Sequence, residues 1–390
     1  MRALIAFDKF KDSMRAPEAC RIAGETLRRA APDWEIDIAP LTDGGEGFAR
    51  ILTTARGGEI RTLAVRGPRR ETTDAEWGWV ALDSIEPELR QWLALPDDGG
   101  LAIVEMAQAS GLQGLPAEQR DPWQATTAGT GELIREAVRE GASAILLGIG
   151  GSATNDIGLG ALEVLGLRFS GPKGAVTDIA PAKWPDVNAV NGSLMKMPRI
   201  LIACDVLNPL LGPDGAAAIY GPQKGLRPQD LSRMQAGMAR MARLLCAFAG
   251  EKDTVIEEVC GGAAGGIGFG FRVVAGATYV PGFELVSRWL RLKEKVRSAD
   301  VVITGEGRFD ASSLQGKGPG SLCRWAMEAG KPSWVFAGQI APELHDQNSR
   351  PDRQPQLRAI SPADLPMEQA LRRGPELLSE AIERAFSAVA

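Results

Sequence analysis

Residues 145–156 read Ile-Leu-Leu-Gly-Ile-Gly-Gly-Ser-Ala-Thr-Asn-Asp, an apolar stretch that passes directly into glycine and small polar residues. The apolar part is typical of a buried strand, and the remainder predicts a loop that leads into a helix. Glycine lets the backbone approach a ligand closely, while the loop N–H groups and the Ser152 and Thr154 hydroxyls can donate to phosphate or carboxylate oxygens. This stretch therefore indicates an α/β fold with an anion site at a strand end.

Three other loops combine glycine with charged or polar residues in the same way. Their sequences are Thr-Asp-Gly-Gly-Glu-Gly at 42–47, Gly-Pro-Gln-Lys-Gly at 221–225 and Thr-Gly-Glu-Gly-Arg-Phe-Asp at 304–310. The chain has 46 glycines in 390 residues, more than proteins ordinarily use, and they follow no collagen-like period. We infer that glycine is concentrated in loops whose backbone conformation matters.

The segments around these loops alternate between strand and helix patterns. A strand at 3–7, a helix from about Arg15, a strand at 35–39 and a helix containing Phe48 occur in βαβα order, which implies a parallel sheet. Residues 61–82 differ, because their apolar side chains alternate as in an antiparallel ribbon. Further strands are expected at 101–106, 144–149, 200–204, 299–304, 333–337 and 357–360, and helices at 131–139, 229–248 and after Pro375. The two chain ends therefore predict one parallel α/β domain, with a second unit inserted between them.

The segment at 260–270 allows two interpretations, and the segment at 345–356 allows one. Residues 260–270 are rich in glycine and alanine, and they predict either a close-packed helix end or another ligand loop. Residues 345–356 are rich in Asp, Gln, Asn, Arg and Pro and predict a surface loop, which contains His345, the single histidine of the chain. With one histidine, a histidine metal cluster is excluded and a His-based catalytic triad is disfavoured.

The composition excludes several classes of protein. Lys and Arg number 44 against 49 Asp and Glu, a formal charge of −5 without a long basic block, so nucleic acid is not an expected partner. Charged residues come too early for a signal peptide, and no segment has ~18 unbroken apolar residues, so we expect no membrane association and a cytoplasmic location. Five scattered cysteines without a C-x-x-C pair predict buried thiols rather than disulfides or a zinc site.

Two nucleotide-binding motifs can be tested directly. Gly148, Gly150 and Ala153 match G-x-G-x-x-A after a strand, but residues 167–172 lack the acidic residue that would hold a ribose in a dinucleotide site. The phosphate-loop pattern G-x-x-x-x-G-K-[ST] does not occur. A kinase would therefore need a different phosphate cradle, with cations on the moving phosphate, carboxylates for magnesium and a carboxylate near the attacking hydroxyl.

The polar loops contain residues suited to each of these tasks. Asp43 could act as a base or metal ligand, or it could only cap the following helix. Lys11 could hold an anion or be a solvated loop charge, and Asp205 could serve catalysis or only form a turn. Arg308 could pair with phosphate or carboxylate, or it could form no more than a surface ion pair with Asp310.

Taken together, these segments resemble the glycerate kinase family, over nearly the whole length of the chain. The resemblance is carried by Phe10-Lys11, Asp43 to Gly47, Glu105-Met106-Ala107, Ala109 to Leu112, Gly129 to Ile134, Gly148 to Asp156, Ala203 to Val206, Asn208-Pro209-Leu210, Gly221 to Gly225, Thr304 to Arg308, Asp310 and Gly316-Lys317. So many matches in one order are hard to obtain by chance.

The resemblance implies a fold and a reaction. The fold would be α/β, with a flavodoxin-like parallel-sheet domain formed by residues 1–62 and 280–390 and an inserted α/β domain at 63–279. The reaction would be ATP-dependent phosphorylation of D-glycerate with Mg²⁺, commonly to 2-phosphoglycerate. The expected catalytic residues are Lys11, Asp43, Asp205 and Arg308, the nucleotide-binding residues Gly150, Gly151, Ser152, Thr154, Asn155 and Lys224, and the metal ligands Asp205 and Asp310.

Several positions depart from the family pattern and leave the substrate open. Lys9 stands where a serine is usual, Ala128 where an aromatic residue is common, Ile157 where a glycine is usual and Ser312 where glutamine is typical. A related hydroxy acid could therefore replace glycerate. The alternatives are a non-catalytic sensor or carrier of a phosphorylated hydroxy acid and a nicotinamide-dependent dehydrogenase, and the chain could be a monomer or a homodimer.

Overall fold

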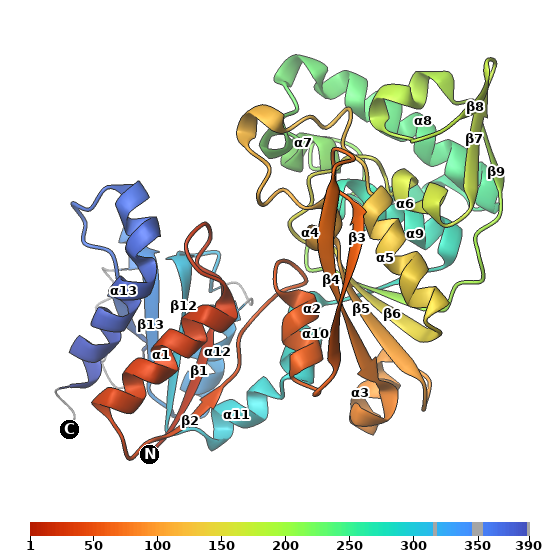
Figure 1. Cartoon of the computed structure of the whole chain (residues 1–390). Helices are drawn as coiled ribbons and strands as arrows, with labels where there is room; N and C mark the ends of the chain where they lie inside the picture. The colour runs from red at the N-terminus through yellow and green to blue at the C-terminus, as the bar shows by residue number, and fades with distance from the viewer. Residues whose placement is uncertain (315–317, 345–353, 388–390) are drawn as a thin grey trace. The chain divides into compact units, whose positions relative to one another are not determined.

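The structure is a computed structural model that describes residues 1–314, 318–344 and 354–387. The chain divides into two compact units (Figure 1). Unit 1 consists of Met1–Asp43 and Phe283–Ala390, and unit 2 of Gly44–Gly282. His345 and most of the surface loop expected at 345–356 lie outside the described residues, as does Lys317.

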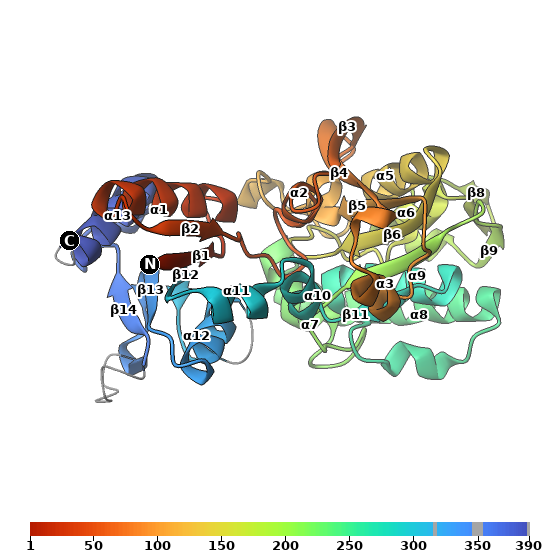
Figure 2. The same ribbon diagram turned by 90° about the horizontal axis from the view of Figure 1, so that it is seen from below.

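The described residues of unit 1 form a five-stranded sheet in the order β14-β13-β12-β1-β2, in which every neighbouring pair is parallel. Helices α1 and α13 pack together on one face, and α11 and α12 lie on the other (Figure 2). The elements are β1 (Arg2–Phe7), α1 (Ala16–Ala30), β2 (Glu35–Ile38), α11 (Leu292–Ser298), β12 (Val301–Phe309), α12 (Gly318–Glu328), β13 (Ser333–Ile340), β14 (Gln356–Ala359) and α13 (Met367–Phe386).

The sequence explains why this sheet is buried on both faces. Every residue from Ala3 to Phe7 is fully buried, as expected for a parallel strand covered by helices on both sides. Helix α1 buries Ala19, Ala23 and Leu27 at helical spacing, and Pro17 lies in its first turn, where the missing N–H is not needed. The predicted parallel arrangement of the chain ends is confirmed.

Unit 2, all of whose residues are described, has a six-stranded mixed sheet in the order β11-β10-β6-β5-β4-β3. The ribbon expected at 61–82 is confirmed as the antiparallel pair β3 and β4, and β5, β6, β10 and β11 are parallel to one another. Its main strands are β3 (Glu59–Arg66), β4 (Thr72–Ala81), β5 (Gly100–Glu105), β6 (Ala142–Gly148), β10 (Arg199–Ala203) and β11 (Thr278–Val280), and a small sheet contains β7 (Leu167–Gly171), β8 (Gly174–Val176) and β9 (Ala189–Gly192). The helices are α2 (Phe48–Thr54), α3 (Pro87–Leu93), α4 (Met106–Ser110), α5 (Ala128–Arg139), α6 (Leu159–Val164), α7 (Ala216–Tyr220), α8 (Leu231–Ala249) and α9 (Ile267–Ala275), and α10 (Gly282–Trp289) begins at the last residue of the unit.

The division between the units differs from the expected boundary near residue 62. Helix α2 was expected in the domain of the chain ends, but it belongs to unit 2 because it packs against β4 and β5. Phe48 and Leu52 are fully buried in this packing. The second division, between Gly282 and Phe283, lies close to the expected residue 280.

The last helix begins earlier than the sequence pattern predicts. Pro375 was expected to open it, yet α13 starts at Met367 and contains Pro375 in its interior. Proline has no N–H to donate to the carbonyl four residues earlier, that of Leu371. The Ser13 hydroxyl donates to this carbonyl at 2.7 Å, so a side chain from outside the helix replaces the missing hydrogen bond.

The glycine-rich segment at 260–270 supports the packing interpretation. It forms a short 3₁₀ turn and the start of α9, and it lies against the loop that follows β6. A Cβ atom on Gly265 would lie 2.0 Å from the Thr154 carbonyl oxygen, closer than any side chain allows. In the part of the chain that the structure describes, no helix is both long and apolar enough to cross a membrane.

Candidate active site

Unit 1 gathers polar groups at the carboxyl edge of its sheet, where parallel sheets usually bind ligands. Asp8 follows β1, and its N–H donates to the Gly305 carbonyl oxygen at 2.9 Å. Gly307 lies so close to the next turn that a Cβ atom there would be 3.2 Å from the Lys11 nitrogen. We call this group the unit 1 edge; it consists of Asp8, Lys11, Asp43, Glu306, Arg308 and Asp310.

Glu306 is the member of the unit 1 edge whose acidity changes most. Burial raises the pKa of its carboxyl group to about 7, and the negative charges of Asp8, Asp310 and Asp43 add to this effect. Its Oε1 atom is buried and has no hydrogen-bond partner among the residues that the structure describes. Sequence reasoning missed Glu306, although it lies within the segment 304–310 that was predicted as a loop; the structure places Glu306 in β12, which continues to Phe309.

The pKa of Asp310 is shifted in the opposite direction, because protein groups donate hydrogen bonds to its carboxylate. The Ser312 hydroxyl and N–H donate to Oδ1 at 2.6 and 2.9 Å, and these bonds hold the pKa of Asp310 below its usual range. The Arg308 guanidinium lies 3.5 Å from the same carboxylate and remains largely exposed. The ion pair considered as the alternative for Arg308 is thus present, but the exposed guanidinium can still reach an anion.

In unit 2 the loop after β6 is held by buried charged groups. Lys224, which is 1% exposed, donates through Nζ to the Ser152 hydroxyl oxygen at 2.8 Å and to the Thr154 carbonyl oxygen at 2.6 Å. Burial lowers the pKa of Lys224 to about 7, and the nearby Asp156 carboxylate partly opposes this. The predicted residues Ser152, Thr154 and Lys224 are therefore brought together, inside the protein.

Asp156 fixes the end of the same loop. Its carboxylate accepts hydrogen bonds from the N–H and hydroxyl of Thr127, both at 2.8 Å, and from the N–H groups of Gly158 and Gly160. Burial raises the pKa of Asp156 despite these bonds. Asn155 is also fully buried, and neither polar atom of its side chain has a partner among the described residues.

Two of the predicted nucleotide-binding residues, Gly150 and Gly151, remain near the surface of this loop. The Gly150 N–H donates to the Gly44 carbonyl oxygen at 2.9 Å, and a Cβ atom on Gly150 would lie 2.5 Å from the Gly45 Cα. Glycine is needed at Gly150 for this approach. The structure therefore brings together two glycine-rich loops that are about a hundred residues apart in the sequence.

Glu105 is a second buried carboxylate to which sequence reasoning gave no role. Glu105 is the last residue of β5. Its carboxylate accepts hydrogen bonds from the N–H groups of Gly47 and Ala49, both at 3.1 Å, at the start of α2. Burial raises the pKa of Glu105. A carboxylate at a helix amino terminus also interacts well with the helix dipole, so Glu105 anchors the loop at 44–47.

The two expected metal ligands are divided between the units, since Asp205 belongs to unit 2 and Asp310 to unit 1. Neither unit contains both. Within the described residues, no group of three or more His, Cys, Asp or Glu side chains is arranged to hold a metal ion.

Comparison with known proteins decides the family. The model of the glycerate kinase family matches residues 3–390, which covers both units. The chain belongs to the glycerate kinase family. It is 36% identical over 341 residues to a glycerate kinase from Halalkalibacterium halodurans, with 86% of this chain and 85% of the relative covered. It is 35% identical over 353 residues to glycerate 2-kinase from Escherichia coli K12, with 88% and 87% covered.

A solved structure agrees with this membership. A crystal structure from Salmonella typhimurium LT2, assigned as a glycerate kinase 2, is 33% identical and aligns with a TM-score of 0.75, covering 100% of this chain and 97% of that chain. The mixed α/β architecture is thus the one found in this neighbour. As a member of the glycerate kinase family, the protein is a kinase that transfers a phosphoryl group to a hydroxyl group, with ATP as donor.

Proposed function

We propose that the protein phosphorylates D-glycerate with ATP and releases 2-phosphoglycerate. The observation that carries this proposal is the unit 1 edge, where cationic and carboxylate side chains meet at the carboxyl ends of parallel strands. These are the groups that phosphoryl transfer to a small hydroxy acid requires. The names of the relatives, glycerate kinase and glycerate 2-kinase, support the substrate.

The two compact units are proposed to be domains, and unit 1 to be flavodoxin-like. Counted within unit 1, the strand order is 2-1-3-4-5, which is the order typical of flavodoxin-like sheets. The chain reverses its direction of winding between β1 and β12. This point is where Asp8, Glu306 and Arg308 lie, and such points are preferred ligand sites in α/β proteins.

The charged residues of the unit 1 edge receive distinct roles. Arg308 and Lys11 hold the glycerate carboxylate or the transferring phosphate, because an exposed guanidinium can pair with either group. Asp43 orients or deprotonates the attacking hydroxyl, a task for which phosphoryl transfer uses a positioned carboxylate. Asp205 of unit 2 remains a proposed catalytic residue because it lies two residues after the end of β10.

The loop after β6 is proposed to bind phosphate through its backbone. Gly151 is exposed in this loop and Gly150 is half-buried, with its N–H bonded to the Gly44 carbonyl oxygen, whereas Ser152, Thr154 and Lys224 are buried and hold the loop in shape. Buried polar groups are rarely left unpaired, so the Asn155 amide is expected to bind a buried water or to take part in ligand binding.

The donor chemistry fits Mg²⁺. Asp310 is kept ionised by its hydrogen bonds, and carboxylate oxygen is the ligand that Mg²⁺ prefers. Mg²⁺ is usually held by one or two carboxylates together with substrate phosphates, so a cluster of three protein ligands is not required. Asp310 and Asp205 are the proposed ligands, and the ion would neutralise charge on the phosphates.

Purified protein incubated with ATP, Mg²⁺ and D-glycerate tests the proposal by the formation of ADP. We expect saturable ADP release that depends on glycerate, and ³¹P NMR of the product should identify the phosphorylated hydroxyl. Saturable binding of glycerate or of its phosphate without ADP release would instead support a carrier. Replacing glycerate by related hydroxy acids in the same assay measures whether the departures at Lys9 and Ile157 change the substrate.

A further inference from the structure

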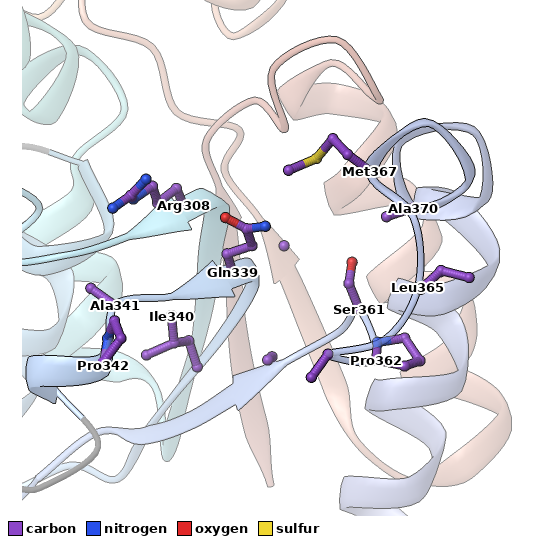
Figure 3. A pocket seen from close by; sticks show the side chains of 13 residues that line it. Arg308, Gln339, Ile340, Ala341, Pro342, Ser361, Pro362, Leu365, Met367 and Ala370 are labelled. Atoms are coloured by element: carbon purple, nitrogen blue, oxygen red, sulfur yellow. The ribbon is translucent and has the colours of Figure 1, made fainter.

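Unit 1 contains a pocket of about 440 Å³ beside the carboxyl ends of β12, β13 and β14 and the start of α13 (Figure 3). Arg308 lies on the β12 side of the pocket, and Met367 and Ala370 lie on the α13 side. Between them lie Gln339, near the end of β13, and Ser361, which follows β14. The volume lies within the range of about 300–1,000 Å³ that is usual for small-molecule sites.

The walls of this pocket are mainly apolar. Ile340, Pro342, Pro362, Leu365 and Met367 line it, and Met367 is 55% exposed. A few polar groups, from Arg308, Gln339 and Ser361, are added to these walls. Apolar walls with a small number of placed polar groups are typical of sites that bind a ring system.

We propose that this pocket binds the adenosine part of ATP. The inference rests on the proposed kinase function, from which it takes the nucleotide. The base packs against the apolar walls, and the Gln339 amide, which can both donate and accept, pairs with its polar edge. The Ser361 hydroxyl is placed for the ribose, and the Arg308 guanidinium for the phosphates.

The other substrate fits this pocket poorly. Glycerate is far smaller than the available volume and has no apolar face, so the apolar walls would gain nothing from it. A purine nucleoside offers both an apolar ring face and hydrogen-bonding edges. The size and the chemistry of the walls therefore favour the nucleotide.

Two tryptophan substitutions in the first turns of α13 form a matched test. Ala370 lines the pocket, whereas its neighbour Gln369 is exposed and does not. We expect Ala370→Trp to fill the pocket and weaken ADP binding at least about tenfold, or about 1.4 kcal/mol, in titration calorimetry, and Gln369→Trp to leave it within about twofold. Circular dichroism of both variants checks that they fold.

Should Ala370→Trp fail to fold, Met367→Ala removes an exposed part of the same wall, and a loss of ADP affinity of about threefold or more is expected. Binding of ADP to Ala370→Trp or Met367→Ala as tight as to the wild type would overturn the assignment. In steady-state assays, Ala370→Trp should raise the KM for ATP and leave the KM for D-glycerate unchanged. A rise in the KM for D-glycerate alone would assign the pocket to the other substrate and overturn the inference.

The two proposals can fail separately. If the wild type binds ADP, Ala370→Trp does not, and no hydroxy acid is phosphorylated, the pocket assignment stands and the proposed function fails. If glycerate is phosphorylated and both pocket variants keep the wild-type affinity for ADP and the wild-type KM for ATP, the function stands and the adenosine pocket is rejected.

Discussion

The Lys224 ammonium nitrogen lies 2.6 Å from the Thr154 carbonyl oxygen, in the interior of unit 2. This cation, which the sequence predicts as a nucleotide-binding residue, holds the backbone of a glycine-rich loop. The same nitrogen also donates to Ser152. The shape of the loop after β6 therefore depends on a residue about seventy positions away, and the stability of unit 2 depends on the protonation of that residue.

Lys224→Met is expected to destabilise the protein by about 1–3 kcal/mol near pH 9, because Ser152 and Thr154 lose a buried hydrogen-bond donor. The pKa of Lys224 is lowered from 10.5 to about 7, so between these values the unfolded chain binds more protons than the folded one. The titration of Lys224 should therefore make the wild-type protein more stable as the pH rises from about 7 to 10, and the variant should lack this rise. Urea unfolding across this range measures both effects.

Lys173→Met is the control for this experiment, since Lys173 is exposed in the turn between β7 and β8. It should leave the stability and its dependence on pH unchanged. If Lys224→Met and the wild type gain stability with pH to the same extent, Lys224 does not titrate as its burial requires.

Glu306→Gln should change the pH dependence of stability in the opposite direction. The pKa of Glu306 is raised from 4.5 to about 7, so in this window the folded state binds more protons, and wild-type stability falls as the pH rises. At pH 8 the variant should be more stable by up to about 3 kcal/mol, at about 1.4 kcal/mol per pKa unit. Thermal unfolding from pH 4.5 to 8, in buffer without divalent ions, measures the difference.

Glu328→Gln, at an exposed position of α12, is the matched control and should follow the wild-type curve. An unchanged slope in Glu306→Gln would show that burial and the nearby negative charges do not raise the pKa of Glu306 in solution.

Asp43→Asn should lower kcat by about 10²–10⁴ with little change in ADP affinity, because the amide keeps the shape of the side chain but cannot accept a proton. Steady-state kinetics with ATP and D-glycerate, together with calorimetry for ADP, separate the two quantities. Asp33→Asn, an exposed position before β2, should behave like the wild type. A kcat near the wild-type value in Asp43→Asn rejects the role proposed for Asp43.

Gly265→Ala should destabilise unit 2 by several kcal/mol, since the new Cβ atom would lie 2.0 Å from the Thr154 carbonyl oxygen. Gly276→Ala is the matched control, because Gly276 also flanks α9 and has a positive φ, of 64°, but a Cβ atom there meets nothing within 4 Å. The control should cost only about 1 kcal/mol of backbone strain. Equal midpoints of urea unfolding for the two variants would show that the loop moves away without cost.

The elements of the fold could be predicted from local sequence patterns. Strand β1, helix α1 and the antiparallel ribbon of β3 and β4 lie close to where the apolar periodicity placed them, because burial of one face or both faces dictates that periodicity. The start of α13 could not be predicted in this way. Pro375 is tolerated inside the helix because Ser13, far away in the sequence, satisfies the carbonyl of Leu371.

The sequence by itself determined the α/β class, the glycine-rich loops and the resemblance to the glycerate kinase family, because these depend on residue order and on local backbone preference. Only the tertiary structure decided which polar side chains are buried. The sequence predicted Lys224 as a nucleotide-binding residue and gave Asp156 no role of its own, yet both side chains are buried. The burial and the pKa of a side chain depend on the segments that pack around it. Around Glu306, the negative charges belong to Asp8, Asp43 and Asp310, which follow three different strands.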